Sequence, residues 1–255
     1  MKRKISLAQW ALVEEHRQKS ITTLDLPRIA RNDFDLNGIE LVNTLMESPT
    51  MSYLDKLKEQ AAVYNTDIIL IMVDEKGDGC AEDVIERKQF AINHFKWIDI
   101  ANYLGCKAIR TNCRGLFSPD PDTALEWAAE SYHPLLEYAS ESNMKILIEN
   151  HGGISNDADW MVQLFEKVNH PLFGSYPDWR EPSEEFDNKY YLRKMLPYAA
   201  GMSYRNQPTE MLTAEMIDMS IDAGYRGWFG IESSGREAIH EGIRMLKKYL
   251  PTLQA

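Results

Sequence analysis

Short apolar runs rich in β-branched and aromatic residues alternate with longer amphipathic stretches along the whole chain. This alternation is typical of parallel strands that are joined by crossover helices. The pattern predicts eight strands, at residues 5–10, 38–42, 67–73, 108–112, 145–150, 173–176, 200–204 and 227–231. The stretches that follow them predict eight helices, at residues 24–32, 53–65, 82–104, 122–143, 158–168, 190–196, 214–223 and 237–250.

The eight strand-and-helix units follow one another without a linker of biased composition. Their boundaries carry suitable residues: Gly105 can end a helix in a left-handed turn, Pro121 can begin one, and Thr213 is a candidate N-cap. The predicted fold is therefore α/β, a single (β/α)8 TIM barrel forming one domain over residues 1–255. A dinucleotide-binding sheet is disfavoured because no GxGxxG motif opens the first helix.

The composition of the chain disfavours two classes of binding partner. The chain has 28 Lys and Arg against 39 Asp and Glu, a formal net charge of −11. This charge repels phosphate backbones, so we expect no nucleic-acid partner. No apolar run reaches the roughly 18 residues of a membrane span, so we expect no membrane partner either. No cleavable signal is evident and the three cysteines form no CxxC pair, which together favour a cytoplasmic protein.

Acidic residues stand where three of the predicted strands end. Residues two apart in a strand share a face, so Glu149 and His151 lie on one face at the end of the fifth strand. Asp178 ends the sixth strand and Glu232 follows the eighth. Because the carboxyl ends of barrel strands meet at one rim, these acids are expected to converge. A single acid at a strand end often caps a loop instead, but three at corresponding ends favour a site.

Three carboxylates in a partly desolvated mouth repel one another unless protons or a cation neutralise them. A divalent metal ion held by Glu149, Asp178 and Glu232 is the simpler solution. Oxygen ligands favour Mg2+ or Mn2+, and a nearby imidazole shifts the preference toward Mn2+, Co2+ or Zn2+.

Other polar and aromatic residues at the same rim are candidates for substrate contact. Arg205 could bind an enediolate, a carboxylate or a phosphate, or could form a salt bridge at the rim. Trp10 could lie against a sugar ring or could simply pack at the top of the barrel. Asn112 could bind a hydroxyl or cap a loop.

The chain resembles the sugar phosphate isomerase/epimerase family, the xylose-isomerase-like TIM barrels that also include endonuclease IV. The resemblance rests on the segments GIELVN (38–43), ILIMVDEKG (69–77), NHFKWIDIANYLGCKAIRTN (93–112), ILIENHGGIS (146–155), VNHPLFGSYPDW (168–179) and AGYRGWFGIE (223–232). It implies one divalent ion held by a Glu, an Asp, a His and a Glu after strands five to eight. Glu149, Asp178 and Glu232 match, whereas Ser203 and Arg205 stand where relatives commonly show His-x-Lys. Water, a substrate oxygen or His151 would then complete the ligand set.

The chemistry that the resemblance implies is proton abstraction next to a carbonyl, through a metal-stabilised enediolate. Glu149 and Glu232 approach from opposite sides of the mouth and would exchange the proton, with His151 as a further catalytic residue. Arg205, Trp10, Asn112 and Ser203 would bind a small-molecule sugar or keto-sugar.

Sugar isomerase or epimerase is the leading hypothesis for the function. A lyase or hydratase acting on a 3-keto-sugar or keto-glycoside is the alternative, because the same site permits loss of a β-substituent. A non-catalytic sugar-binding barrel is the second alternative. An endonuclease is disfavoured by the acidic charge and by having only six His. The sequence leaves a homo-oligomer open.

Overall fold

Eight parallel strands form the centre of the molecule. The computed structural model describes residues 4–115, 120–180, 183 and 186–250. The strands are β1 (Ile5–Ala8), β2 (Gly38–Val42), β3 (Asp67–Met72), β4 (Ala108–Thr111), β5 (Lys145–Ile148), β6 (Phe173–Ser175), β7 (Ser203–Tyr204) and β8 (Phe229–Ile231). They pair in the order β6-β5-β4-β3-β2-β1-β8-β7. This cyclic order confirms the predicted (β/α)8 barrel.

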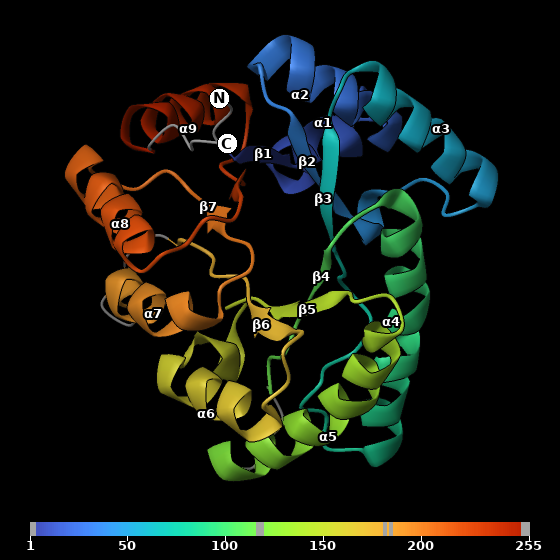
Figure 1. Cartoon of the computed structure of the whole chain (residues 1–255), viewed down its shortest axis with the longest axis vertical. Helices are drawn as coiled ribbons and strands as arrows, with labels where there is room; N and C mark the ends of the chain where they lie inside the picture. The colour runs from blue at the N-terminus through green and yellow to red at the C-terminus, as the bar shows by residue number, and fades with distance from the viewer. Residues whose placement is uncertain (1–3, 116–119, 181–182, 184–185, 251–255) are drawn as a thin grey trace.

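The helices surround the strands on the outside of the ring, as Figure 1 shows. In the described part of the chain they are α1 (Val13–Arg17), α2 (Leu26–Phe34), α3 (Met51–Val63), α4 (Val84–Leu104), α5 (Pro121–Ser140), α6 (Ala158–Val168), α7 (Asn188–Met195), α8 (Glu210–Asp222) and α9 (Arg236–Tyr249). Short 3-10 turns lie at Gln9–Leu12, Thr23–Asp25, Asn43–Leu45, Gly153–Asn156 and Leu196–Tyr198. No helix of the described residues is long and apolar enough to cross a membrane.

Alternate residues of each strand face two different apolar layers. The larger layer lies between the strands and the helices and includes Ile146 and Ile148 of β5. The smaller layer lies inside the barrel and consists of Ala8, Val42, Leu70, Met72, Ala108, Leu147 and Tyr176. A residue two positions after Leu147 therefore continues the inward face, which directs position 149 into the mouth of the barrel.

The barrel closes between β6 and β7 by single bridges rather than by a continuous ladder. Parallel bridges join Ser175 to Ala199 and Asp178 to Ser203. Around them, the amide of Ser203 donates to the carbonyl of Pro177, and the amide of Trp179 donates to the carbonyl of Ser203. The closure thus brings the start of β7 directly beside the chain that follows β6.

Most predicted elements are confirmed, and most differences lie at their ends, but helix α1 (Val13–Arg17) was not predicted. The strand predicted at 200–204 is reduced to Ser203–Tyr204. The Thr213 N-cap prediction is wrong, because helix α8 begins earlier and its N-cap is Thr209, whose hydroxyl accepts from the amide of Leu212. The first strand ends at Ala8, so Trp10 lies in the following 3-10 turn. Gly105, by contrast, ends α4 with a φ of 87°, as predicted.

Candidate active site

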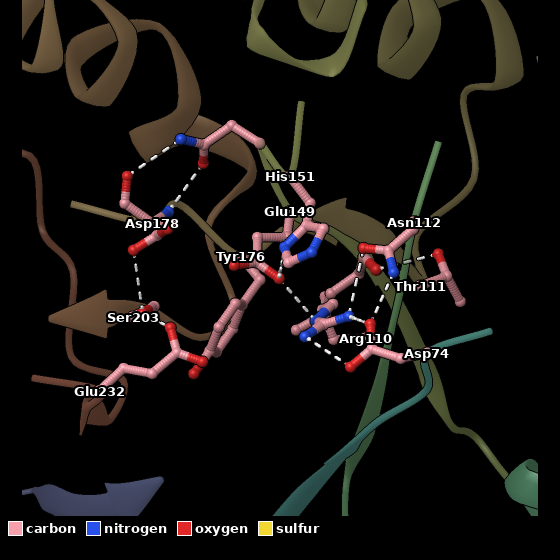
Figure 2. Close-up of polar contacts among 12 residues, drawn as sticks. Asp74, Arg110, Thr111, Asn112, Glu149, His151, Tyr176, Asp178, Ser203 and Glu232 are labelled. Carbon is pink, nitrogen blue, oxygen red and sulfur yellow. Dashed lines mark hydrogen bonds and ion pairs between the residues drawn. The ribbon is translucent and has the colours of Figure 1, made fainter. Parts of the chain in front are cut away.

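Three buried carboxylates meet at the carboxyl-terminal mouth of the barrel. Glu149 follows β5, Asp178 lies three residues after β6, and Glu232 follows β8 directly. Each offers an oxygen that lies within 4.8 Å of an oxygen of the other two. Figure 2 shows Asp178 and Glu232 on one side and Glu149 nearer the centre of the group. The structure therefore brings together the three acids that the strand ends predicted.

Local backbone bonding fixes two of these positions. The side chain of Asn150 holds the chain at Asp178, because its Oδ1 accepts from the Asp178 amide at 2.7 Å and its Nδ2 donates to the Asp178 carbonyl at 3.0 Å. The amide of Glu232 donates to the carbonyl of Tyr204 at 2.9 Å, which continues the pairing of β8 with β7. The acids thus project from the sheet itself rather than from long loops.

A buried arginine pairs with the first of the acids. Arg110 lies in β4 with none of its side chain exposed, and its Nε is 2.7 Å from Glu149 Oε2. Its Nη1 forms an ion pair with Asp74, and Asn112 Nδ2 donates to the same Asp74 carboxylate at 2.6 Å. The Arg110–Glu149 contact is an ion pair without the alignment of a hydrogen bond. Glu149 Oε1 has no hydrogen-bond partner among the described residues.

A second arginine bridges the other two acids. Arg205 Nε lies 2.8 Å from Asp178 Oδ1, and its Nη2 lies 2.8 Å from Glu232 Oε2. The Ser203 hydroxyl lies 3.1 Å from Asp178 Oδ1 and 2.5 Å from Glu232 Oε2, so its one proton can be donated to only one of them. These contacts use one oxygen of each carboxylate and leave the second oxygen of each outside the bridge.

Two cavities flank the acids and share His151 in their walls. The larger, about 580 Å³, is lined by Asn150, His151, Asp178, Arg180, Arg205, Asn206, Ser233, Ser234 and Ala238. The smaller, about 300 Å³, is lined by Trp10, Thr44, Asp74, Glu75, Gly77, Asp78, Asn112, Arg114 and His151. His151 Nδ1 lies 3.4 Å from Glu149 Oε2. Trp10, Asn112, His151 and Arg205 therefore all reach the walls, whereas Ser203 is buried beneath Arg205.

The three acids differ in their protonation. Burial favours the neutral form of Glu149, but the charge of Arg110 and the contact with His151 outweigh burial and lower its pKa. Burial and the charge of Glu149 raise the pKa of Asp178, although Arg205 opposes them. The same two causes raise the pKa of Glu232 to about 8. Without a cation, the cluster therefore tends to take up protons on the side of Asp178 and Glu232.

A divalent cation fits this set of donors. Ionised Asp74, Glu149, Asp178 and Glu232 carry four negative charges, and Arg110 with Arg205 supplies two positive charges. The remaining two charges lie on buried groups, which is costly unless they are neutralised. The three candidate ligand groups are carboxylates, and oxygen donors are what Mg2+ and Mn2+ prefer. The structure thus contains an acidic triad that could hold a metal ion.

Sequence reasoning missed Arg110 and Asp74, although a signal for the first was present. A lone arginine in the apolar strand AIRT is too costly to bury without a carboxylate partner, so its presence predicts one nearby. The partner could not be identified from the sequence because it depends on the strand register. In that register Arg110 is paired with Leu147, two residues before Glu149.

Comparisons with known proteins agree with the fold. The family model described as xylose isomerase-like TIM barrel matches residues 30–201. No curated protein matches the chain at a significant level.

Solved structures resemble the chain over nearly its full length. A D-tagatose 3-epimerase-like protein has a TM-score of 0.77 at 13% identity, with 97% of each chain covered. The apo 3-keto-D-glucoside 4-epimerase of E. coli has a TM-score of 0.75 at 11% identity, covering 97% of this chain and 99% of that one. A xylose isomerase-like TIM barrel protein from Mycobacterium smegmatis, in complex with magnesium, has a TM-score of 0.71 at 15% identity, covering 98% and 100%. At these identities the similarity shows the fold alone.

Proposed function

Because this chain belongs to the xylose isomerase-like TIM barrel family, we propose that it is a divalent-metal-dependent sugar isomerase or epimerase. The reaction proposed is removal of a proton next to a carbonyl and its return to the same or the adjacent carbon. One observation carries the proposal: three buried carboxylates meet at the barrel mouth, and together with Asp74 they carry, when ionised, two negative charges more than Arg110 and Arg205 neutralise. Solved sugar epimerases of the same fold support it.

In this proposal Glu149, Asp178 and Glu232 hold one Mg2+ or Mn2+ ion, with Co2+ or Zn2+ as weaker candidates. Glu149 Oε1, buried without a hydrogen-bond partner among the described residues, is the donor atom most in need of a cation. When bound, the ion supplies Lewis-acid stabilisation of negative charge on the substrate oxygen. Ser203 is a poor ligand, and its hydroxyl instead orients the Asp178 and Glu232 carboxylates.

The side chains divide the remaining tasks. Glu149 and Glu232 project from β5 and β8, so they approach a substrate between them from different directions and act as the acid–base pair. His151 lies beside Glu149 with a third of its side chain exposed, where it relays a proton to or from the substrate. Arg205 donates to anionic oxygen, Asn112 binds a hydroxyl, and Trp10 lies against the sugar ring in the smaller cavity.

Metal removal tests the proposal first. The protein is dialysed against chelator and then assayed on a panel of ketoses and keto-sugars, before and after readdition of Mn2+ or Mg2+. We expect activity to be lost with the ion and restored by it. Activity that ignores the ion would contradict the metal-dependent mechanism.

Solvent-deuterium incorporation into the substrate tests the acid–base roles. Glu149→Gln and Glu232→Gln should each lower incorporation by about 100-fold or more, the usual contribution of a positioned acid or base. Glu241→Gln is the matched control, because Glu241 pairs with Arg244 on the exposed face of α9. Full exchange in both site variants would reject these residues as the acid–base pair.

A lyase or hydratase acting on a 3-keto-sugar or keto-glycoside is the second candidate. His151 favours it, because an imidazole that is partly exposed at the mouth can protonate a departing β-oxygen. Product analysis distinguishes the two, since a lyase yields an unsaturated ketone and a free alcohol or water. A barrel that binds the ion and sugars but exchanges no deuterium with any of them would instead be a non-catalytic sugar-binding protein.

A further inference from the structure

Two buried cysteines from different segments lie against each other near the mouth. Cys80 lies between β3 and α4, and Cys113 follows β4 by two residues. Their Sγ atoms are 2.8 Å apart, and both side chains are buried. A disulfide bond is about 2.0 Å long, so the two sulfurs need to approach by less than about 1 Å to be bonded.

Backbone contacts already hold these two segments together. The carboxylate of Asp78 accepts from the amide of Cys80 at 3.0 Å, from Arg114 at 3.0 Å and from Gly115 at 2.8 Å. One side chain thus binds the chain on both sides of the cysteine pair. Its three hydrogen bonds hold together the two backbone segments that carry the cysteines.

Asp78, Cys80 and Cys113 also form a group whose ligand atoms are close enough for a metal ion. The sulfur separation argues against that use. A tetrahedral zinc ion about 2.3 Å from each sulfur would hold the sulfurs about 3.8 Å apart, well beyond the 2.8 Å found here. The oxygens of Asp78 are moreover engaged by backbone amides.

We infer that Cys80 and Cys113 are a redox modification site, at which a reversible disulfide ties the segment after β3 to the segment after β4. With hydrogen peroxide as the oxidant, both S–H bonds break and one S–S bond forms. The peroxide O–O bond breaks, and its two oxygens take the two hydrogens and leave as two water molecules. A dithiol reductant reverses the change by thiol–disulfide exchange.

The disulfide between Cys80 and Cys113 would join two segments that form the wall of the smaller cavity. Asp74 and Asp78 from the first segment and Asn112 and Arg114 from the second all line it. Burial raises the pKa of Cys113 well above its usual range, so its thiol stays protonated at neutral pH and reacts slowly. A small oxidant is therefore the suitable reagent, because it needs less opening of the fold than a larger one to reach buried sulfur.

Peptide mapping tests the inference on the wild-type protein. The protein is treated with hydrogen peroxide, unfolded, alkylated and digested. We expect a cross-linked pair of peptides containing Cys80 and Cys113, with a mass loss of two hydrogen atoms, and its disappearance after dithiol treatment. Cys106 is the internal control, because it precedes β4 and lies at the opposite end of that strand from Cys113. It should remain fully alkylated.

Thermal unfolding gives an independent measure. A disulfide that closes the loop from Cys80 to Cys113 restricts the unfolded chain, so oxidation should raise Tm by several degrees in wild type. Cys80→Ser and Cys113→Ser should lose this shift, and Cys106→Ser should keep it. Alkylation of all three cysteines after oxidation, or a disulfide that includes Cys106, would overturn the inference. The wild-type peptide map decides even if a serine variant does not fold.

Discussion

The two arginines divide the mouth of the barrel into unlike halves. Arg110 is fully buried between Glu149 and Asp74, whereas 36% of the Arg205 side chain is exposed where it bridges Asp178 and Glu232. Arg110 and Glu149 are enclosed, so their ion pair is part of the protein interior, whereas Asp74 also lines the smaller cavity. Around Arg205 they line a cavity of about 580 Å³. The half around Arg110 is thus built into the interior, whereas the half around Arg205 borders a cavity.

Removing the buried arginine should have the largest effect on stability. Arg110→Met leaves Glu149 and Asp74 buried without their counter-charge, which should lower the free energy of unfolding by about 3–5 kcal/mol. Urea unfolding measures this loss. Arg244→Met, which removes an exposed pair with Glu241, is the control and should change nothing measurable. A loss below about 1 kcal/mol in Arg110→Met would show that the two halves do not differ as proposed.

Glu40 is a buried carboxylate that, unlike Glu149, forms no ion pair with an arginine among the described residues. Glu40 accepts from Ser6 Oγ at 2.7 Å and from the hydroxyl of Tyr176. Burial raises its pKa to about 7, although these hydrogen bonds and the more distant charge of Arg110 oppose the shift. The folded protein therefore favours the neutral form of Glu40, unlike Glu149. This contribution to stability is complete below the unfolded pKa, near 4.5, and is lost as the pH rises through about 7.

The raised pKa of Glu40 predicts how replacing its carboxylate changes stability with pH. Relative to wild type, Glu40→Gln should become more stable by up to about 3 kcal/mol between pH 4.5 and pH 7, and the difference should stay constant above that. Urea unfolding of both proteins across this range gives the difference, in which other titrating groups cancel. A pH-independent difference would mean that Glu40 is ionised in the folded state.

Removing Arg205 should lower the unfolding free energy less than removing Arg110, and the loss should depend on whether Mg2+ is present. Arg205→Met should lower the unfolding free energy by about 1–2 kcal/mol in metal-free buffer, because Asp178 and Glu232 lose charge-assisted hydrogen bonds. Added Mg2+ should then stabilise the variant more than it stabilises wild type, since the ion replaces the missing positive charge. Calorimetric scans with and without Mg2+ measure both values. An equal gain in the two proteins would argue against a cation between these carboxylates.

The smallest effect is expected at the hydroxyl beneath Arg205. Ser203→Ala removes one hydrogen bond to Asp178 or Glu232, and should lower the unfolding free energy by about 1 kcal/mol. Because serine is a poor ligand, metal affinity should be nearly unchanged, which titration calorimetry with Mn2+ can measure. A large loss of Mn2+ affinity would show that Ser203 contacts the ion.

The sequence predicted the barrel and the three converging acids for the same reason. Parallel strands meet at one rim, so Glu149, Asp178 and Glu232 could be placed there from the strand ends alone. The sequence did not predict that Arg110 would pair with Glu149, because that contact depends on the register of β4 against β5. A salt bridge of Arg205 at the rim was one of its two expected roles, but its partners Asp178 and Glu232 were not identified, because the closure between β6 and β7 places Asp178 beside Ser203.

That closure has a consequence for motion. Single bridges close the ring between β6 and β7, at Ser175 with Ala199 and at Asp178 with Ser203, whereas ladders of two to five residue pairs join the other neighbouring strands. Local opening of the barrel should therefore begin at this junction. In deuterated solvent, the backbone amides beside it should exchange their hydrogens sooner than the amides of β2 and β3. Such an opening would move Asp178 away from Ser203 and Glu232 and would loosen the grip on any bound ion. The rate at which a bound ion is released would then depend on how often the junction between β6 and β7 opens.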